Sequence, residues 1–394
     1  HSNLTGMKAF FRVPIHGHGN FNLPENPPTL LLAVAHCHQL TPSVRPFCRV
    51  APVRVRLSPL AIASDAESTA FEARREAALR QAIAQDYQDR DQIHVPMHRV
   101  GVTAGASAGL LLSLAAVLSA GDELLVTDPG YPCNRQFALA VGAIPKPLVT
   151  HAEHNYQPRL EAIQKAWGPK TRAVLLASPA NPTGAIVDLE SIQAIAQWVR
   201  SKGGWLIMDE IYLRLSLQGP LRSALSVSHD IISVNSFSKT YAMTGWRLGW
   251  VVIPEALVGV MERLAQNLFI SPPFLSQQAA IAAFSPETRR IADGYREQFL
   301  RQSKVLLPGL QALGFRLPVQ PVGGFYGFFD VSELTDDSFR FCEELCDHAG
   351  VLMAPGRDFT DEKAQTMVRV SFPKSEPVLQ EGLLRIQTFL AAGA

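Results

Sequence analysis

Short apolar runs recur along the chain from about residue 99, and amphipathic stretches lie between several of them. Seven runs have the length and composition of buried strands, and they cover residues 99–103, 123–128, 144–149, 173–178, 205–209, 231–235 and 248–253. Residues 189–200 and 255–268 instead repeat their apolar positions with a helical period. Strands that alternate with helices predict an α/β fold with a mostly parallel seven-stranded sheet covered by helices.

The pattern changes after about residue 286. A long helical stretch is followed by short apolar runs and one more helical stretch, at residues 286–313, 315–317, 324–331, 338–349, 351–354 and 367–372. This order predicts a smaller α+β C-terminal domain over residues 286–394, next to a large domain over residues 78–285. Residues 1–77 have no persuasive helical or strand period, so we expect an irregular N-terminal segment there.

Composition limits the class of protein. Apolar residues make up 47% of the chain and charged residues 18%, which suits a sizeable core. A net charge of +1 gives no general attraction to nucleic acid or to acidic membranes, so neither is expected as a partner. The longest apolar runs are too short to cross a bilayer. The five cysteines are scattered and odd in number, which predicts no disulfide framework and a cytoplasmic location. No metal site is expected either.

The most informative stretch is residues 236–249, which holds a single lysine among hydroxyl-bearing and small residues. Lys239 follows Ser236 and Ser238, and Arg247 comes eight residues later. A lysine amine can form a Schiff base with an aldehyde, and serines with an arginine can hold a phosphate dianion. An aldehyde and a phosphate on one small molecule describe pyridoxal phosphate.

A second phosphate-binding element is expected after the first strand of the large domain. Gly105, Ala106 and Ser107 open a helical stretch there. The start of a helix offers free backbone N–H groups and the positive end of the helix dipole, and Ser107 adds a hydroxyl. An ordinary helix cap is the alternative. Together with the hydroxyls and the arginine of residues 236–249, these residues would complete one phosphate cup.

Four more polar or aromatic residues stand where a strand has ended or inside an apolar strand. Asp209 ends an apolar strand, where a buried carboxylate needs a partner such as a protonated pyridine nitrogen or the N–H groups of the next turn. Asn181 lies in a turn that two prolines and a glycine make rigid. Tyr131 can stack on a pyridine ring or pack in the core. Arg369 would either bind a substrate carboxylate or face solvent.

These motifs resemble those of the class I/II aminotransferases, pyridoxal-phosphate enzymes of fold type I, from about residue 78 to the C-terminus. The resemblance implies that Lys239 holds the cofactor and is catalytic, that Tyr212 and Asn181 donate to its phenolic oxygen, and that Asn181 and Arg369 bind the substrate. The implied cofactor-binding residues are Gly105, Ala106, Ser107, Tyr131, Asn181, Asp209, Tyr212, Ser236, Ser238, Lys239 and Arg247.

The resemblance also implies an activity and its partners. The expected reaction moves an amino group from an L-amino acid to a 2-oxo acid, in a homodimer. Residues 269–273 and 323–326 are expected to line the pocket, which indicates apolar or aromatic substrates. A pyridoxal-phosphate-dependent lyase of the C–S β-lyase type, a cofactor-binding protein with impaired catalysis and a ligand-sensing module are the alternatives. The same site supports several bond cleavages, so the residues alone leave these alternatives open.

The resemblance stops before residue 78. The family has a Gly-x-Pro-Asp-type turn and a tyrosine-containing stretch near its N-terminus, and residues 1–77 contain neither. One hypothesis is that this segment is a frameshifted or rearranged version of the usual N-terminus. Part of the substrate pocket and of the dimer contact depends on this segment in the family.

Overall fold

The computed structural model describes residues 65–392 of the chain, and they belong to one compact unit. Its first helix, α1 (Asp65–Asp91), begins inside the segment expected to be irregular through residue 77. That expectation is therefore wrong from Asp65 onward. The reason is local, because α1 is rich in alanine, glutamate, glutamine and arginine, which favour a helix even without a clear apolar stripe. The expectations for residues 1–64 lie outside the described residues.

A seven-stranded sheet forms the centre of the structure, in the order β1-β7-β6-β5-β4-β2-β3. Its strands are β1 (Val100–Thr103), β2 (Glu123–Asp128), β3 (Ile144–Val149), β4 (Thr171–Ala177), β5 (Trp205–Asp209), β6 (Ile232–Ser236) and β7 (Gly249–Val252). Strand β7 is antiparallel to both β1 and β6, and the other neighbouring strands are parallel. The predicted mostly parallel, seven-stranded sheet is confirmed.

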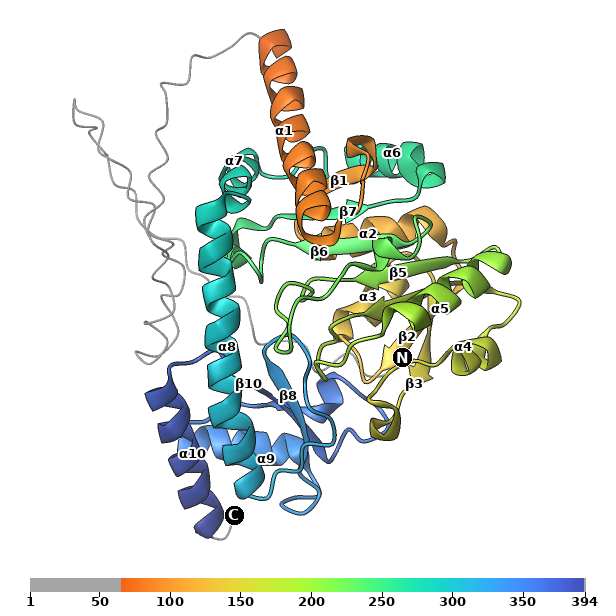
Figure 1. Ribbon diagram of the computed structural model, residues 1–394. Helices are drawn as coiled ribbons and strands as arrows, with labels where there is room; N and C mark the ends of the chain where they lie inside the picture. Colours follow the sequence, from red (N-terminus) through yellow and green to blue (C-terminus); the bar gives the residue numbers. More distant parts are fainter. Residues whose placement is uncertain (1–64, 393–394) are drawn as a thin grey trace, which may run out of the picture. The chain divides into compact units, whose positions relative to one another are not determined.

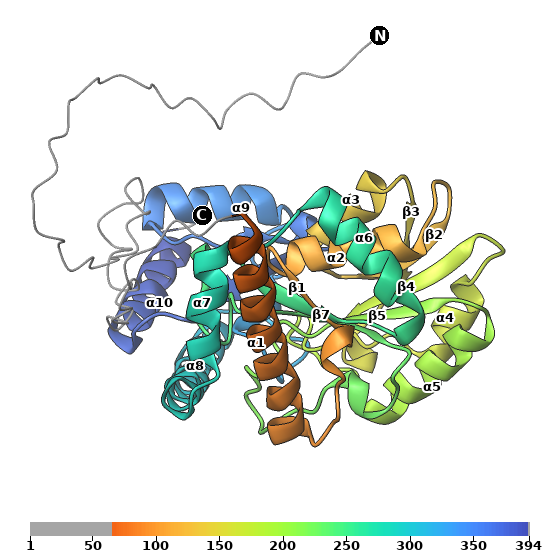
Figure 2. The same ribbon diagram turned by 90° about the horizontal axis from the view of Figure 1, so that it is seen from above.

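Helices cover both faces of this sheet (Figures 1 and 2). One layer contains α2 (Ala106–Val117), α3 (Pro132–Ala140) and α6 (Val258–Leu268), and the other contains α1, α4 (Leu160–Ala166), α5 (Leu189–Ser201) and α7 (Phe274–Ala283). Successive strand residues alternate between the layers. Leu124 and Val126 pack with the first layer, and Leu125 packs with the second. Burial on both faces explains why these strands are continuous apolar runs in the sequence.

The C-terminal part builds a second, antiparallel sheet in the order β8-β10-β9. Its elements are α8 (Pro286–Ala312), β8 (Tyr326–Asp330), α9 (Ser338–Glu344), the π-helical turn η7 (Leu345–Ala349), β9 (Ala354–Pro355), β10 (Met367–Ser371) and α10 (Glu376–Ala391). The Ser285 hydroxyl accepts from the Thr288 N–H and caps α8, which begins at Pro286 as predicted. A domain boundary at residue 286 stays a prediction.

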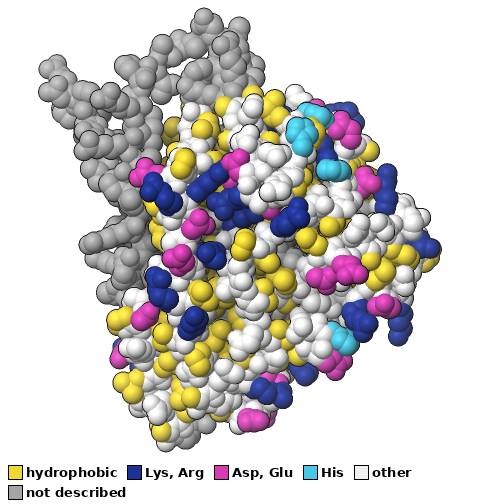
Figure 3. All heavy atoms as spheres, in the orientation of Figure 1, with side chains coloured by type: hydrophobic (Ala, Val, Ile, Leu, Met, Phe, Trp, Pro, Cys, Tyr) yellow, Lys and Arg dark blue, Asp and Glu magenta, His cyan; other side chains and the backbone are white. Residues whose placement is uncertain are grey.

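Basic and acidic side chains are interspersed on the face shown in Figure 3. This mixture agrees with the net charge of +1. Among the described residues, no helix is long and apolar enough to cross a membrane. The same part of the chain holds no group of three or more histidine, cysteine, aspartate or glutamate residues arranged to bind a metal ion.

The direction of β7 brings several chain segments to one edge of the large sheet. Strands β1, β2, β4, β5 and β6 end at this edge, and β7, which runs the opposite way, begins there. Ligands of open α/β sheets bind outside the carboxyl ends of the strands. The candidate residues of the large sheet all lie in segments that meet at this edge.

Candidate active site

The segments predicted to form a phosphate cup meet at the ends of β1 and β6. Gly105 has a left-handed φ of 84°, and a Cβ atom there would lie only 2.7 Å from the Arg247 Nη2 atom. A Cβ at Gly249 would lie 2.8 Å from the Ala106 nitrogen, so only glycine allows the three segments to approach this closely. The start of α2 and the Arg247 guanidinium therefore face the same small space, as a phosphate dianion requires.

The two serines of this cup differ in their surroundings. The Ser236 hydroxyl donates to the Leu248 carbonyl over 3.2 Å and accepts from the Ser238 N–H over 3.0 Å. The single proton of the Ser236 hydroxyl is thus donated within the protein, and its two hydrogen bonds hold the loop that carries Lys239 in place. The Thr244 hydroxyl braces the same segment by donating to the Ser238 carbonyl over 2.7 Å. The Ser238 side chain is itself buried at the site.

Lys239 lies in this braced loop, and its Nζ atom is 5.6 Å from the centre of the Phe325 ring. Burial lowers the pKa of Lys239, and the positive charges of Arg369 and Arg247 lower it further, while Asp209 acts in the opposite direction. A lowered pKa favours the neutral amine, which is the nucleophilic form of lysine. The structure thus brings the lysine, the predicted phosphate ligand and the predicted carboxylate ligand together.

Asp209 is buried at the end of β5. Burial raises its pKa to about 6, the negative charge of Glu210 adds to this rise, and the Ile211 N–H and Lys239 oppose it. The Ile211 N–H donates to its Oδ1 atom over 3.1 Å, so the aspartate also holds the following turn, which was the alternative reading of the sequence. A buried carboxylate of this kind is stabilised by a cationic ring nitrogen.

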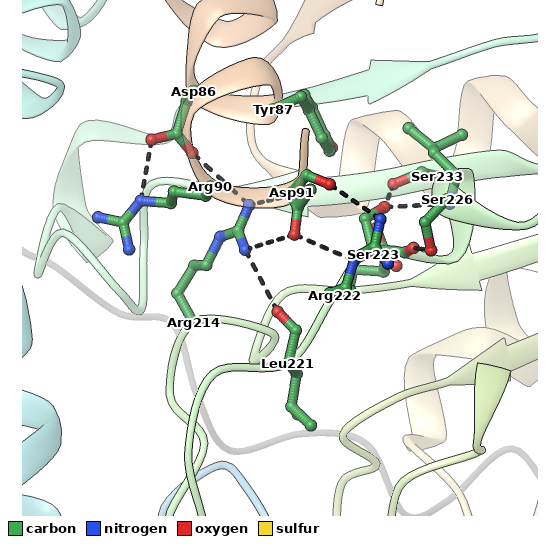
Figure 4. Close-up of polar contacts among 12 residues, drawn as sticks. Asp86, Tyr87, Arg90, Asp91, Arg214, Leu221, Arg222, Ser223, Ser226 and Ser233 are labelled. Carbon is green, nitrogen blue, oxygen red and sulfur yellow. Dashed lines mark hydrogen bonds and ion pairs between the residues drawn. The ribbon is translucent and has the colours of Figure 1, made fainter. Parts of the chain in front are cut away.

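Glu210, the next residue, serves the core instead of the site. Its carboxylate accepts from the Ser223 and Ser233 hydroxyls over 2.8 and 2.7 Å, and from the Ala224 N–H. A buried network continues from there to the end of α1, where Asp91 accepts two hydrogen bonds from Arg214 (Figure 4). This network fixes the back of the loop that carries Tyr212.

Aromatic side chains line the other walls of the site. The Tyr212 hydroxyl lies 3.1 Å from the Tyr326 hydroxyl, and both residues are buried. Burial raises the pKa of Tyr131, as do its hydrogen bond with Cys133 and the charges of Asp209 and Tyr326. The charge of Asp209 also raises the pKa of Tyr212, so both tyrosines lie within electrostatic reach of this carboxylate.

Arg369 turns toward the site from β10. Its Nη1 atom donates to the Asn181 Oδ1 atom over 2.9 Å. Its guanidinium carbon lies 4.2 Å from the centre of the Tyr326 ring and 4.5 Å from that of Phe359. The buried Arg369 Nε atom has no hydrogen-bond partner among the described residues. A planar guanidinium held toward the site by Asn181 is suited to a substrate carboxylate, so the solvent-facing alternative is not what the structure shows.

Two residues of this site were not predicted as ligands. Tyr326 belongs to the stretch that was expected to line the pocket, but its hydrogen bond to Tyr212 has no local sequence signal. Phe359 follows a short 3-10 turn and carries no motif at all. Both positions depend on contacts between segments far apart in the sequence.

Comparison with known proteins agrees with this geometry. The family described as "Aminotransferase class I and II" matches residues 55–386, which begins earlier than the resemblance at residue 78. The valine–pyruvate aminotransferase of Mycobacterium tuberculosis is 40% identical over 314 residues, covering 79% of this chain and 81% of the relative. The aspartate/prephenate aminotransferase of Thermus thermophilus is 32% identical over 315 residues, covering 79% and 80%.

Solved structures show the same fold. A crystal structure of an aminotransferase from Mycobacterium tuberculosis superimposes with a TM-score of 0.77 at 40% identity, covering 80% of this chain and 82% of that one. A Thermus thermophilus aspartate aminotransferase variant gives 0.75 at 32% identity, covering 79% and 86%. A family match over most of the chain, close relatives and a shared fold lead to one conclusion. The chain belongs to the class I and II aminotransferases and is a pyridoxal-phosphate-dependent transaminase.

Proposed function

We propose that the protein moves the amino group of an L-amino acid with an apolar side chain to a 2-oxo acid. The observation that carries the proposal is that Lys239 and Arg369 face two adjacent rings. The Lys239 Nζ atom lies 5.6 Å from the Phe325 ring centre, and the Arg369 guanidinium carbon lies 4.2 Å from that of Tyr326, with 4.5 Å between the two ring centres. The charge of Asp209 also acts on the Lys239 amine. This places a carboxylate for a cationic ring and a guanidinium for a substrate carboxylate around one nucleophile.

The residues present suit pyridoxal phosphate. Its phosphate would lie against the start of α2, Ser238 and Arg247, and its ring nitrogen against Asp209. Tyr212 and Asn181 would donate to its phenolic oxygen. When bound, the cofactor supplies an aldehyde that takes up amines and a protonated ring that takes up electrons.

Lys239 would act twice. It would hold the aldehyde carbon through its amine, and once displaced by the substrate amine it would carry a proton away from the substrate Cα as a general base. Its lowered pKa suits both roles. Arg369 would fix the substrate carboxylate so that this proton lies within reach.

The preference for apolar substrates has two supports. Phe325, Tyr326 and Phe359 surround the Lys239 and Arg369 side chains, and one relative acts, by its name, on valine and pyruvate. The test mixes the cofactor-loaded protein with valine, phenylalanine and aspartate in single-turnover absorbance measurements, followed by pyruvate. We expect a spectral change with valine or phenylalanine that pyruvate reverses. Release of ammonia and pyruvate from a cysteine-type substrate would identify a lyase. An absorbance spectrum that no amino acid changes would identify an impaired catalyst.

We further propose a homodimer, as in the resembling family. Its support is a set of exposed apolar side chains where α6 ends and α7 begins: Leu268 is 56% exposed, Ile270 87% and Leu275 58%. Ile270 also has a left-handed φ of 62°, which is rare for a β-branched residue. Light scattering of the full chain tests this, and an Ile270→Asp protein should shift toward the monomer. A cytoplasmic location remains a prediction from the scattered cysteines.

Arg369→Lys is expected to lower kcat/KM for amino acids by about 100-fold, because lysine keeps the charge but loses the planar fork. The absorbance of the bound cofactor should stay, since Arg369 faces the substrate end of the site. Arg357→Lys is the matched control, because Arg357 also stacks on a ring, that of Phe339. An Arg369→Lys protein with unchanged kcat/KM would remove this residue from substrate binding.

Cofactor affinity is expected to fall as the pH drops through about 6, the pKa of Asp209. Above this pH the carboxylate is charged and attracts a protonated ring nitrogen, and below it the carboxylate is neutral and the attraction is lost. Asp209→Asn should bind the cofactor more weakly and lose this part of the pH dependence, whereas the exposed Asp293→Asn should behave as the wild type. Equilibrium titrations of the apoprotein from pH 5 to 8 measure both effects, and identical pH profiles for Asp209→Asn and the wild type would contradict the assignment.

A further inference from the structure

Tyr326 is a buried residue of β8 that contacts both ends of the proposed site. Its hydroxyl lies 3.1 Å from the Tyr212 hydroxyl, at the cofactor end. Its ring lies under the Arg369 guanidinium, with 4.2 Å between the guanidinium carbon and the ring centre, at the substrate end. Tyr326 is 7% exposed and Tyr212 4%, so water has little access to the bond between them.

The direction of this hydrogen bond follows from counting protons. A tyrosine hydroxyl has one proton to donate and lone pairs to accept with. If Tyr212 donates its proton to the cofactor's phenolic oxygen, its own oxygen can only accept from Tyr326. Tyr326 must then be the donor, and a phenol that accepts a hydrogen bond is itself a stronger donor.

We propose that Tyr326 is a positioning residue that acts through Tyr212 on the phenolic oxygen of the cofactor and through its ring on Arg369. This inference rests on the proposed function. By orienting and polarising Tyr212, Tyr326 would stabilise the negative charge on the phenolic oxygen. By packing under Arg369, it would hold the guanidinium in the plane that a substrate carboxylate meets.

Two substitutions separate these contributions. Tyr326→Phe removes the hydroxyl and leaves the ring under Arg369, whereas Tyr326→Leu removes both. Tyr87→Phe is the matched control, because the Tyr87 hydroxyl is also buried and accepts a hydrogen bond, from the Trp250 Nε1 atom over 3.2 Å, away from the site. A merely structural role of Tyr326 would change stability and leave the spectrum of the bound cofactor unchanged.

The main readout is a pH titration of the absorbance of the bound cofactor in the full-length protein. For Tyr326→Phe we expect the midpoint to rise by about half a pH unit, because the negative charge on the phenolic oxygen loses support, with less than a twofold change in KM. For Tyr326→Leu we expect the same rise together with about a tenfold higher KM for the amino acid. Tyr87→Phe should keep the wild-type midpoint and KM.

The inference is overturned if Tyr326→Phe titrates with the wild-type midpoint or with a lower one, or if Tyr326→Leu leaves KM unchanged. Failure of the proposed function would look different. In that case the wild-type protein would show no absorbance from bound cofactor, and no titration could be measured. Thermal unfolding of each variant shows that the proteins compared are folded. If Tyr326→Leu is unfolded at the assay temperature, Tyr326→Met replaces it, because methionine also lacks both the ring and the hydroxyl and fills more of the buried space.

Discussion

Lys239→Ala protein is expected to lose turnover by at least about 10⁴-fold, because one substitution removes both the covalent anchor and the general base. Burial and the charges of Arg369 and Arg247 lower the pKa of the amine that it removes. The phosphate cup at Gly105 and Arg247 remains, so the variant should still bind the cofactor without a covalent bond.

Two measurements test this separation of anchoring from binding. Borohydride reduction followed by mass spectrometry should show the cofactor mass on the wild-type chain and none on Lys239→Ala. Equilibrium dialysis should still show bound cofactor in the variant. The exposed Lys170→Ala is the control and should behave as the wild type in both. Covalent attachment or full turnover in Lys239→Ala would place the anchor on another residue.

Much of this site could be predicted because most of its residues lie at or just after the end of a strand that the sequence makes plain. Strands β2 and β5 have the predicted bounds, since buried parallel strands are mostly continuous apolar runs. The edge strand β3 also has the predicted bounds, although most of its residues are not buried. Once the strands are placed, their carboxyl ends meet at one edge, and Asp209 and Asn181 come with them. The residues that come together at this edge could therefore be predicted from the sequence at the end of each strand.

The remaining features depend on contacts between distant segments. Tyr212 and Tyr326 are 114 residues apart, and no local pattern predicts that their hydroxyls meet. Ser236 resembles a phosphate ligand, yet its proton goes to the Leu248 carbonyl because the chain folds back there. The early start of α1 was missed because strong helix formers stabilise it without a persuasive apolar stripe.

The buried ion pair between Asp91 and Arg214 also joins two segments that are far apart in the sequence. Breaking it is expected to have the largest effect on the free energy of unfolding. Asp91 ends α1, and Arg214 follows Tyr212 in the loop after β5 (Figure 4). The Asp91 side chain is 0% exposed and that of Arg214 13%. Arg214 donates from both Nη atoms to the two carboxylate oxygens, while the Arg222 Nη2 atom donates to the Asp91 carbonyl over 3.0 Å. This geometry satisfies both charges. Removing Asp91 leaves the buried Arg214 with only the more distant Asp86 carboxylate at 3.8 Å, and removing Arg214 leaves the Asp91 carboxylate without its cation.

Asp91→Ala is therefore expected to destabilise the fold by about 3–5 kcal/mol, whereas Arg385→Ala, which breaks an exposed ion pair with Glu381, should cost less than about 1 kcal/mol. Urea unfolding followed by circular dichroism measures both. The double variant Asp91→Leu with Arg214→Met should recover much of the loss, because two apolar side chains leave no unpaired charge. Equal unfolding midpoints for Asp91→Ala and Arg385→Ala would mean that α1 is held to the loop of Tyr212 by packing alone. Recovery in the double variant, with loss in each single one, would show that the unpaired charge, and not lost packing, unfolds the protein.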